Sequence, residues 1–152
     1  MLENLPVPAF AAAATGGRTV TIAGQAGRPF VLYFYPKDNT PGCTDEGIQF
    51  RDLYPRFQAA GCDVYGVSRD RLGSHEGFKA KMGFPFDLIS DPEEALCELF
   101  GVMKVKNMYG KKVRGIERST FLIDGKALVR GEWRGVKVPG HAQVVLDAAE
   151  EL

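Results

Sequence analysis

This sequence has few cysteines and histidines, no excess of charge and no long apolar run. Its 152 residues include three cysteines and two histidines. The cysteines, Cys43, Cys62 and Cys97, are far apart along the chain. An odd, sparse set of this kind does not build a disulfide framework, and none of its spacings is typical of a zinc site. We therefore expect a fold that depends on its hydrophobic core and uses no metal and no cofactor.

The absence of net charge and of long apolar stretches excludes further classes of protein. Lys and Arg number 19, as do Asp and Glu, whereas nucleic-acid binders usually carry a basic excess. No stretch reaches the ~18 apolar residues of a membrane span. The apolar run from Ala9 follows Pro6 and Pro8, and no basic residue precedes Arg18, unlike in a secretory signal. We expect a cytoplasmic protein that binds neither nucleic acid nor membrane.

The hydrophobic pattern predicts strands and helices in alternation. Phe30–Tyr35 is a continuous apolar and aromatic run between two prolines, which is typical of a fully buried strand. Two further buried strands are expected over Asp63–Ser68 and Phe86–Ser90. Apolar residues at helical spacing predict a helix from about Thr44 to Ala60. Pro55 interrupts this helix, so we expect a kink or a break there.

The other predicted elements complete an α/β fold. They are an irregular lead-in over 5–17, a short strand at Thr19–Ile22, a helix over Ser74–Met82 capped by Ser74, a helix from an Asp91 cap to Gly101, a hairpin of Thr120–Ile123 with Ala127–Trp133, and a last helix over His141–Glu150. Such alternation, followed by a hairpin, indicates a mixed central β-sheet flanked by helices. The length suits one domain, spanning residues 1–152.

The stretch YPKDNTPGCT, residues 35–44, joins the first buried strand to the first helix. Cys43 is therefore expected in or just before the first helical turn, at the carboxyl end of the strand, where ligands bind in open α/β sheets. Free backbone N–H groups and the helix dipole favour a thiolate at this position.

A helix terminus alone does not make a fast thiol nucleophile. Lowering a thiol pKa from about 8.5 to about 6 requires roughly 3.4 kcal/mol, and a helix terminus supplies at most ~2 kcal/mol. A nearby cation is needed for the rest. Fuller ionisation raises the thiolate fraction only about 30-fold, so donors must also stabilise charge on a leaving oxygen, at ~3–4 kcal/mol each. The Thr40 hydroxyl, backbone N–H groups and an arginine are suitable.

The spacing Pro36-x-x-x-Thr40-x-x-Cys43 resembles the active-site motif of peroxiredoxins. The longer string YPKDNTPGCT, followed by Glu46, resembles the bacterioferritin-comigratory-protein, or Q-type, subfamily. Three more segments are similar to that subfamily: GVSRD at 66–70, FGV at 100–102 and GIERSTFLID at 115–124. The resemblance thus extends along most of the chain.

This resemblance implies a thioredoxin-like fold and a thiol-dependent peroxidase that reduces hydrogen peroxide and organic hydroperoxides in antioxidant defence. It makes Cys43 the peroxidatic nucleophile that becomes a sulfenic acid, with Thr40 hydrogen-bonding the peroxide and Arg118 supporting thiolate and substrate. The implied substrate-binding residues are Pro36, Pro41, Gly42 and Glu46. For Glu46 the alternative is a carboxylate that only favours the helix start.

The sequence departs from the subfamily at the resolving cysteine. Many Q-type members carry it five residues after the first cysteine, where this chain has Ile48, or in the following helix, which here has no cysteine. Cys62 and Cys97 are expected in the core, with a resolving role after local unfolding as the alternative. We expect a one-cysteine cycle in a monomer, with thioredoxin, glutaredoxin or glutathione as the external thiol.

Three other functions fit parts of the same pattern. A thioredoxin-like disulfide oxidoreductase needs a C-x-x-C pair, but Thr40 stands at the place of its first cysteine. A non-catalytic binding module on a thioredoxin fold is the second, because fold does not fix function. Glutathione peroxidase-like chemistry is the third, although Thr-Pro-Gly-Cys fits peroxiredoxins better.

Several polar residues are expected at the surface. His75 and His141 lie near predicted helix starts and are expected to be exposed. The basic segment from Lys104 to Arg114 is interpreted as a solvated loop, with a docking surface for a reductant as the alternative. Trp133 is expected to pack in the hairpin.

Overall fold

A mixed seven-stranded sheet forms the centre of the computed structural model, which describes residues 2–152. Its strands are β1 (Ala11–Ala14), β2 (Arg18–Thr21), β3 (Phe30–Phe34), β4 (Asp63–Ser68), β5 (Asp87–Ser90), β8 (Ser119–Ile123) and β9 (Val129–Arg134). They lie in the order β2-β1-β5-β4-β3-β8-β9. The pairs β3–β4 and β4–β5 are parallel, and the others are antiparallel. The predicted mixed sheet with flanking helices is confirmed.

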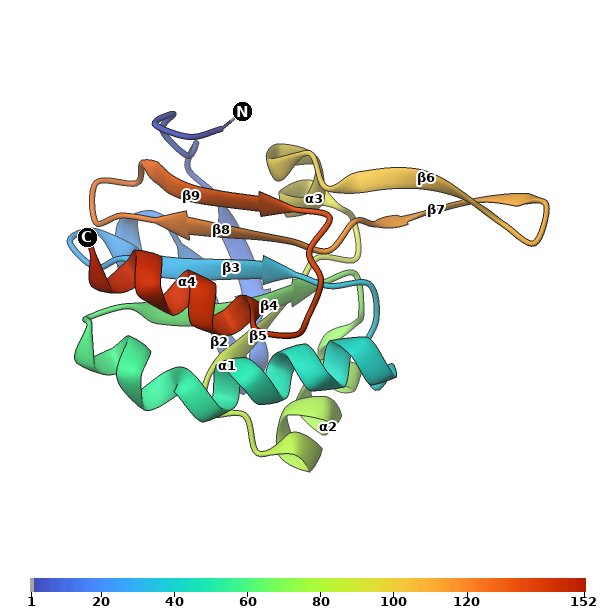
Figure 1. Cartoon of the computed structure of the whole chain (residues 1–152), viewed down its shortest axis with the longest axis horizontal. Helices are drawn as coiled ribbons and strands as arrows, with labels where there is room; N and C mark the ends of the chain where they lie inside the picture. The colour runs from blue at the N-terminus through green and yellow to red at the C-terminus, as the bar shows by residue number, and fades with distance from the viewer. Residues whose placement is uncertain (1) are drawn as a thin grey trace.

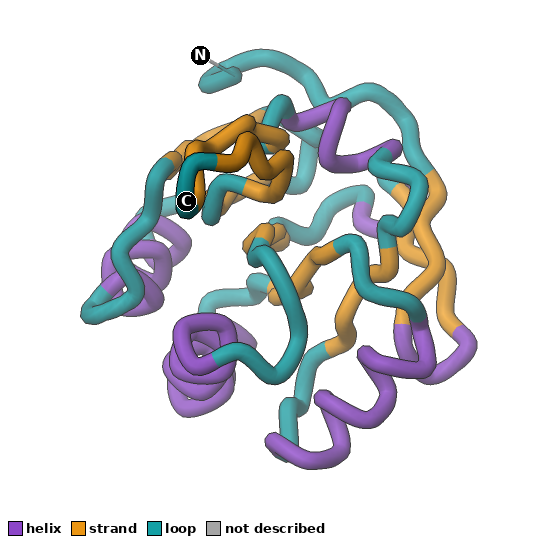
Figure 2. Tube along the Cα trace, turned by 90° about the vertical axis from the view of Figure 1, so that its right-hand side faces the viewer, coloured by secondary structure: helices purple, strands orange, loops and turns teal. Residues whose placement is uncertain are grey.

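Helices cover both faces of this sheet (Figures 1 and 2). They are α1 (Pro41–Ala59), α2 (Leu72–Met82), α3 (Ala95–Phe100) and α4 (His141–Glu150), with short 3-10 turns η1 (Thr15–Gly17) and η2 (Ala23–Gln25). The helices α1, α2 and α4 contribute to one buried cluster, and α3 contributes to the other. Across residues 2–152, every helix is too short or too polar to span a lipid bilayer.

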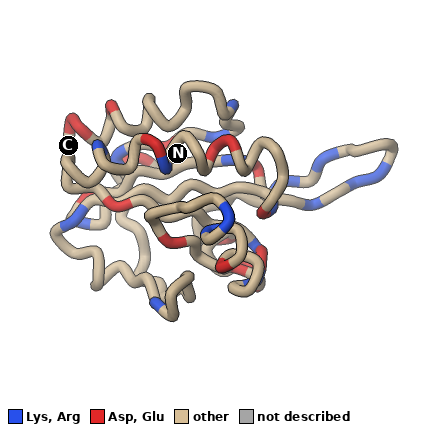
Figure 3. Tube along the Cα trace, turned by 90° about the horizontal axis from the view of Figure 1, so that it is seen from below, with Lys and Arg blue, Asp and Glu red and all other residues tan. Residues whose placement is uncertain are grey.

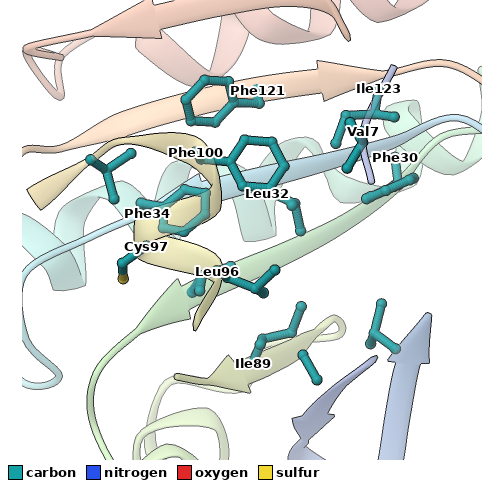
Figure 4. Packing of buried hydrophobic residues seen from close by; sticks show 14 of the residues in the cluster. Val7, Phe30, Leu32, Phe34, Ile89, Leu96, Cys97, Phe100, Phe121 and Ile123 are labelled. Carbon is teal, nitrogen blue, oxygen red and sulfur yellow. The ribbon is translucent and has the colours of Figure 1, made fainter. Parts of the chain in front are cut away.

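Strand β3 is buried on both faces, as its unbroken apolar run predicts. Phe30, Leu32 and Phe34 point into the cluster that includes α3, where Phe34 packs against Phe100 and Phe121 (Figure 4). The alternate residues Val31, Tyr33 and Tyr35 belong to the cluster beneath α1 and α4. The period of two along a strand separates these sets. The sheet therefore divides the core into two, and only one half lies beneath α1.

Helix α1 begins earlier than predicted and is not broken. It starts at Pro41 and runs to Ala59, with Pro55 inside it. A proline removes one intrahelical hydrogen bond and crowds the preceding turn. Here Phe50 and Phe57, on either side of Pro55, are both fully buried in the same cluster. Their burial stabilises the helix across the proline, so of the expected kink or break the break is wrong.

The predicted starts of α2 and α3 are also corrected. Helix α2 begins at Leu72, and Ser74 lies inside it and does not cap it. Helix α3 begins at Ala95, because Glu94 has a φ of 66° and closes a turn before it. Asp91 still caps this helix from a distance. Its carboxylate accepts hydrogen bonds from two helix N–H groups, those of Leu96 at 3.1 Å and Cys97 at 2.8 Å.

Two strand regions were not predicted. Part of the lead-in forms β1, which pairs with both β2 and β5. The basic segment expected to be a solvated loop forms a separate two-stranded hairpin, β6 (Met103–Met108) with β7 (Lys111–Ile116). Its lysines mask the strand pattern, because neither face of the ribbon is buried along most of its length.

The close approach of α1 to the loop after α2 predicts a stability change. A Cβ added at Gly47 would lie 2.3 Å from the Phe84 ring, which Phe78 and Phe86 hold from two sides. We expect Gly47→Ala to destabilise the fold by about 1–3 kcal/mol through overpacking. The control Gly77→Ala, in α2 with open space around it, should stabilise by up to ~1 kcal/mol. Urea unfolding midpoints measure both, and equal midpoints would contradict this packing.

Candidate active site

Cys43 lies in the first turn of α1, at the carboxyl end of β3. Thr40 is the N-cap residue, and Pro41 and Gly42 precede the cysteine in the helix. The backbone N–H groups of this first turn have no partner within the helix. The Cys43 side chain is buried, with 2% of the residue exposed. The position confirms the expectation that this thiol stands at a helix start.

The strand register brings Arg118 to the same edge of the sheet. Strand β8 runs antiparallel to β3, with Ser119 opposite Phe34, the last residue of β3. Arg118 immediately precedes Ser119, so its side chain starts where the loop to α1 begins. Its Nη2 donates to Cys43 Sγ at 3.5 Å, and its Nη1 donates to Glu46 Oε1 at 2.6 Å. One guanidinium thus joins the thiol and a buried carboxylate.

Gly42 leaves the space that this guanidinium occupies. A Cβ at Gly42 would lie 3.2 Å from Arg118 Nη2, which is tighter than ordinary van der Waals contact. A larger residue would therefore push the arginine away from Cys43. This gives Gly42 a steric role beside the thiol.

Glu46 is a buried partner of Arg118. It is 1% exposed, and burial raises the pKa of Glu46 to about 7, although the Arg118 charge pulls it down. Its Oε2 and the nearby Tyr33 hydroxyl have no hydrogen-bond partner among the described residues. The alternative was a carboxylate that only favours the helix start, but Glu46 lies beyond the first turn of α1, which has no acidic residue.

Three of the predicted site residues belong to the loop and the helix start that precede Cys43. Thr40 is half-buried, and its hydroxyl donates to the Lys37 carbonyl at 2.8 Å. A hydroxyl has one donor and two acceptor lone pairs, so Thr40 retains acceptor capacity. Pro36 and Pro41 are exposed and bound the loop between β3 and α1. Their fixed φ angles limit its conformations.

A buried polar network, which the sequence did not predict, fixes the loop between β3 and α1 to helix α2. Asp38 Oδ2 lies 2.8 Å from His75 Nδ1, and Asp38 Oδ1 accepts a 2.6 Å hydrogen bond from the Tyr35 hydroxyl. Ser74 also donates to Asp38, at 2.7 Å. Burial opposes ionisation of Asp38, but these hydrogen bonds outweigh it and hold its pKa below the usual value. The loop is thereby tied to α2.

His75 is fully buried, so its expected exposure is wrong. Its Nε2 lies 2.9 Å from the Ile89 carbonyl oxygen. Both ring nitrogens thus lie within hydrogen-bond distance of an oxygen atom. Asp38, Asp70 and His75 are close enough together to resemble a metal site, but their side chains serve each other and the loop: Asp70 Oδ2 accepts from the Asp38 N–H at 2.9 Å.

Comparisons with known proteins identify the family of this chain. Residues 4–131 match the AhpC/TSA family. The chain belongs to the AhpC/TSA family. Over 134 residues, 88% of this chain and 84% of the relative, it is 56% identical to peroxiredoxin Bcp of Xanthomonas campestris. It is 45% identical to peroxiredoxin Bcp of Bacillus subtilis over 136 residues, 90% of this chain and 87% of that one.

Solved structures give the same subfamily. A structure of the Xanthomonas campestris bacterioferritin comigratory protein, solved to study its alkyl peroxide reduction activity, has a TM-score of 0.89 and 52% identity. The match covers 93% of this chain and 90% of the Xanthomonas campestris chain. BcpB of Mycobacterium tuberculosis is 28% identical and has a TM-score of 0.88. The match covers 100% of this chain and 98% of the BcpB chain. This peroxiredoxin of the Bcp, or Q-type, subfamily is a thiol peroxidase with a thioredoxin-like fold, which decides against the three alternative functions.

The other two cysteines of this peroxiredoxin lie far from Cys43. Cys62 follows the far end of α1, and from Cys43 to Ala59 that helix rises about 24 Å. Cys97 lies on α3, beside Phe34 in the other half of the core (Figure 4). A disulfide needs Cα atoms within about 7 Å. Neither cysteine can pair with Cys43 without a large rearrangement of the fold.

Neither distant thiol is prepared for reaction. Both are fully buried. Burial, with the charge of Asp63, raises the pKa of Cys62 to about 12. Burial, with the hydrogen bond and charge of Asp91, raises the pKa of Cys97 still further. Both therefore remain protonated at neutral pH, as expected of core cysteines.

His141, the first residue of α4, is buried, contrary to expectation. Its Nε2 lies 2.8 Å from Thr120 Oγ1, and its ring packs against Phe50 and Trp133. Burial, with the Arg118 charge, lowers the pKa of His141 to about 4. The imidazole is therefore neutral at physiological pH, so it adds no second positive charge near Arg118.

Glu46 and His141 predict opposite trends of stability with pH. The pKa of Glu46 is raised from 4.5 to about 7 on folding, so ionising it weakens the fold as pH rises through that window. The pKa of His141 falls from 6.5 to about 4, so stability increases between pH 4 and 6.5. Between about pH 4.5 and 6.5 we expect the stability of Glu46→Gln to rise with pH, because the His141 contribution remains. Over the same range the stability of His141→Gln should fall, because the Glu46 contribution remains.

Urea unfolding at half-unit pH intervals measures these slopes. The wild type should show the flattest profile, because the two contributions oppose each other. Equal profiles for the wild type and both variants would contradict the assignment. The slope with denaturant concentration should stay constant, so that each midpoint reports stability alone.

Proposed function

We propose that Cys43 is the peroxidatic cysteine of a one-cysteine cycle that reduces alkyl hydroperoxides and hydrogen peroxide. The observation that carries the proposal is the contact of Cys43 with Arg118 at the start of α1. Among the three cysteines, only Cys43 combines a helix N-terminus with an arginine donor at its sulfur. The alkyl peroxide activity ascribed to the Xanthomonas campestris relative supports the substrate class.

In the first step the Cys43 thiolate attacks the hydroxyl oxygen of the hydroperoxide. The S–O bond forms as the O–O bond breaks, sulfur is oxidised to a sulfenic acid, and the leaving alkoxide takes up a proton to become an alcohol. Arg118 stabilises the thiolate and the negative charge on the departing oxygen. In this proposal the Thr40 hydroxyl, which donates to the Lys37 carbonyl, accepts a hydrogen bond from the peroxide hydroxyl. Pro36 and Pro41 shape the loop before Cys43, and Gly42 leaves room for the Arg118 guanidinium.

Glu46 acts through Arg118. Its carboxylate fixes one side of the guanidinium by the 2.6 Å contact, so that the other side faces the sulfur. A fixed donor needs no reorganisation when charge develops. Glu46 is therefore a positioning residue in this proposal, and Cys43, Thr40 and Arg118 are the catalytic residues.

An external thiol completes the cycle. Its sulfur attacks the sulfenic sulfur, an S–S bond forms, the S–O bond breaks and water leaves. A second thiol then releases Cys43 and carries away the disulfide. The length of α1 between Cys43 and Cys62, and the location of Cys97 in the other half of the core, favour this route over an internal disulfide. Thioredoxin, glutaredoxin and glutathione are the candidate reductants, and the chain acts as a monomer.

Intact mass after one equivalent of hydrogen peroxide tests the cycle. Free thiols are then alkylated and the oxidised position is mapped. We expect one added oxygen, at Cys43, with Cys62 and Cys97 still alkylated under denaturing conditions. A mass lower by two hydrogens, with Cys43 linked to either one, would overturn the one-cysteine cycle while keeping the peroxidatic assignment. Oxygen at another cysteine would overturn both.

A further inference from the structure

The hairpin of β6 and β7 concentrates the positive charge of a neutral chain. Residues 103–116 contain five cationic side chains and no Asp or Glu: Lys104, Lys106, Lys111, Lys112 and Arg114. The rest of the chain therefore holds 14 cationic and 19 anionic residues. Figure 3 shows the hairpin as a basic arm that extends beyond the body of the molecule. A zero net charge conceals this separation of charge.

The lysines of the arm have no internal partners. Arg114 is tied to the body by ion pairs with Glu94 and with Glu98, the latter at 2.9 Å. None of the four lysines makes an ion pair within residues 2–152. Large apolar side chains are exposed among them: Val105, Met108, Tyr109 and Val113, with Tyr109 99% exposed at the tip. Exposed apolar groups beside unpaired charges are typical of a recognition surface.

The arm stands beside the reactive thiol. Strand β7 ends at Ile116, two residues before Arg118, whose guanidinium contacts Cys43. The hairpin therefore leaves the body at the edge of the sheet where β3 ends and α1 begins (Figure 1). A partner that presents a thiol to Cys43 approaches this edge and comes within reach of the arm.

We propose that the β6–β7 hairpin is the docking arm for an acidic protein dithiol that reduces the Cys43 sulfenic acid. The inference rests on the proposed one-cysteine cycle, in which the reductant must come from outside. Four unpaired lysines favour a negatively charged partner and speed its encounter. The position beside Cys43 favours a thiol protein over nucleic acid, because phosphate groups do not reduce a sulfenic acid.

The chemical step is balanced by the partner's two thiols. The first attacks the sulfenic sulfur, forming a mixed disulfide and releasing water. The second attacks the partner's own sulfur in that disulfide and returns Cys43 as a thiol. The partner is thereby oxidised to its disulfide by two electrons, the same two that the peroxide took from Cys43.

Two triple variants test the docking arm. The first is Lys106→Gln, Lys111→Gln and Lys112→Gln in the hairpin. The matched control is Lys81→Gln, Lys126→Gln and Lys137→Gln, which removes three exposed charges elsewhere. Each is assayed with a thioredoxin of net negative charge and with uncharged dithiothreitol, at low and at high salt.

We expect the hairpin variant to raise the KM for the acidic thioredoxin about tenfold, as three exposed ion pairs would together contribute. Its KM should also lose most of its dependence on salt. Turnover with dithiothreitol and single-turnover oxidation of Cys43 by peroxide should match the wild type. The control variant should leave all of these values within about twofold of the wild type.

Equal KM values for the two triple variants would overturn the docking arm. So would an unchanged KM together with lost binding of double-stranded DNA by the hairpin variant, which would assign the arm to nucleic acid. Failure of Cys43 to react with peroxide in the wild type would instead overturn the proposed function, and this reaction is measured without any reductant protein.

Discussion

Replacing Cys43 with serine is expected to abolish peroxide reduction, lowering kcat/KM by more than about a thousandfold. The serine hydroxyl fits the same buried space beside Arg118, but it does not ionise near neutral pH and is a weak nucleophile. The fold should remain intact, because the side chain keeps its size. Peroxide consumption with dithiothreitol as reductant measures the loss, and far-UV circular dichroism checks the fold.

The other cysteines provide the matched controls. Cys62→Ala and Cys97→Ala should keep peroxide turnover near that of the wild type, because neither thiol reaches Cys43. Each should lose about 1 kcal/mol of stability from the small space left in the core. Peroxide reduction retained in Cys43→Ser would contradict the assignment of Cys43 as the nucleophile. Turnover lost in either alanine variant would make that cysteine a resolving partner.

Replacing Arg118 with alanine is expected to lower the rate constant for the reaction with peroxide about a hundredfold, equivalent to ~2.7 kcal/mol. The variant loses the donor to Cys43 Sγ and the charge that faces the leaving oxygen. It also leaves Glu46 buried without its cation. Stopped-flow oxidation of the reduced enzyme isolates this step from the later reaction with thiol.

Two further variants separate the role of Arg118 in the reaction from its role in the fold. Arg118→Ala combined with Glu46→Gln removes the buried carboxyl group that the single variant leaves without its partner, so it should recover stability without recovering rate. Arg114→Ala removes an arginine of the hairpin that is paired with glutamates but does not contact Cys43, and it should react with peroxide at the wild-type rate. A loss of less than threefold in Arg118→Ala would exclude Arg118 from the site.

Local patterns predict the frame of this site well. The run Phe30–Tyr35 identifies β3, and the apolar spacing after the loop places Cys43 close to a helix start, because each feature depends on neighbours in the chain. The helix begins at Pro41, three residues before the predicted Thr44. The close approach of Arg118 to Cys43 does not depend on neighbours in the chain. It follows from the antiparallel register of β8 with β3, and in the sequence it was supported only by the family resemblance.

The buried histidines show why the rest escaped prediction. His75 and His141 lie in α2 and at the start of α4, positions that a local reading places at the surface. Their burial depends on partners distant in sequence, Asp38 for one and Thr120 for the other. The hairpin was missed for the opposite reason. Its strands pair with each other and bury little, so no apolar alternation marks them.

Because Cys43 is isolated from the other two thiols, the fraction of enzyme that is oxidised depends on the concentrations of peroxide and thiol around it. With no internal thiol in reach, the proposed sulfenic acid lasts until a reductant arrives, so its lifetime is inversely proportional to the concentration of reduced thiol. When that concentration falls, a second peroxide has time to carry the sulfur on to sulfinic acid, which few systems reverse. The steady-state fraction oxidised at Cys43 would then follow the ratio of peroxide to thiol.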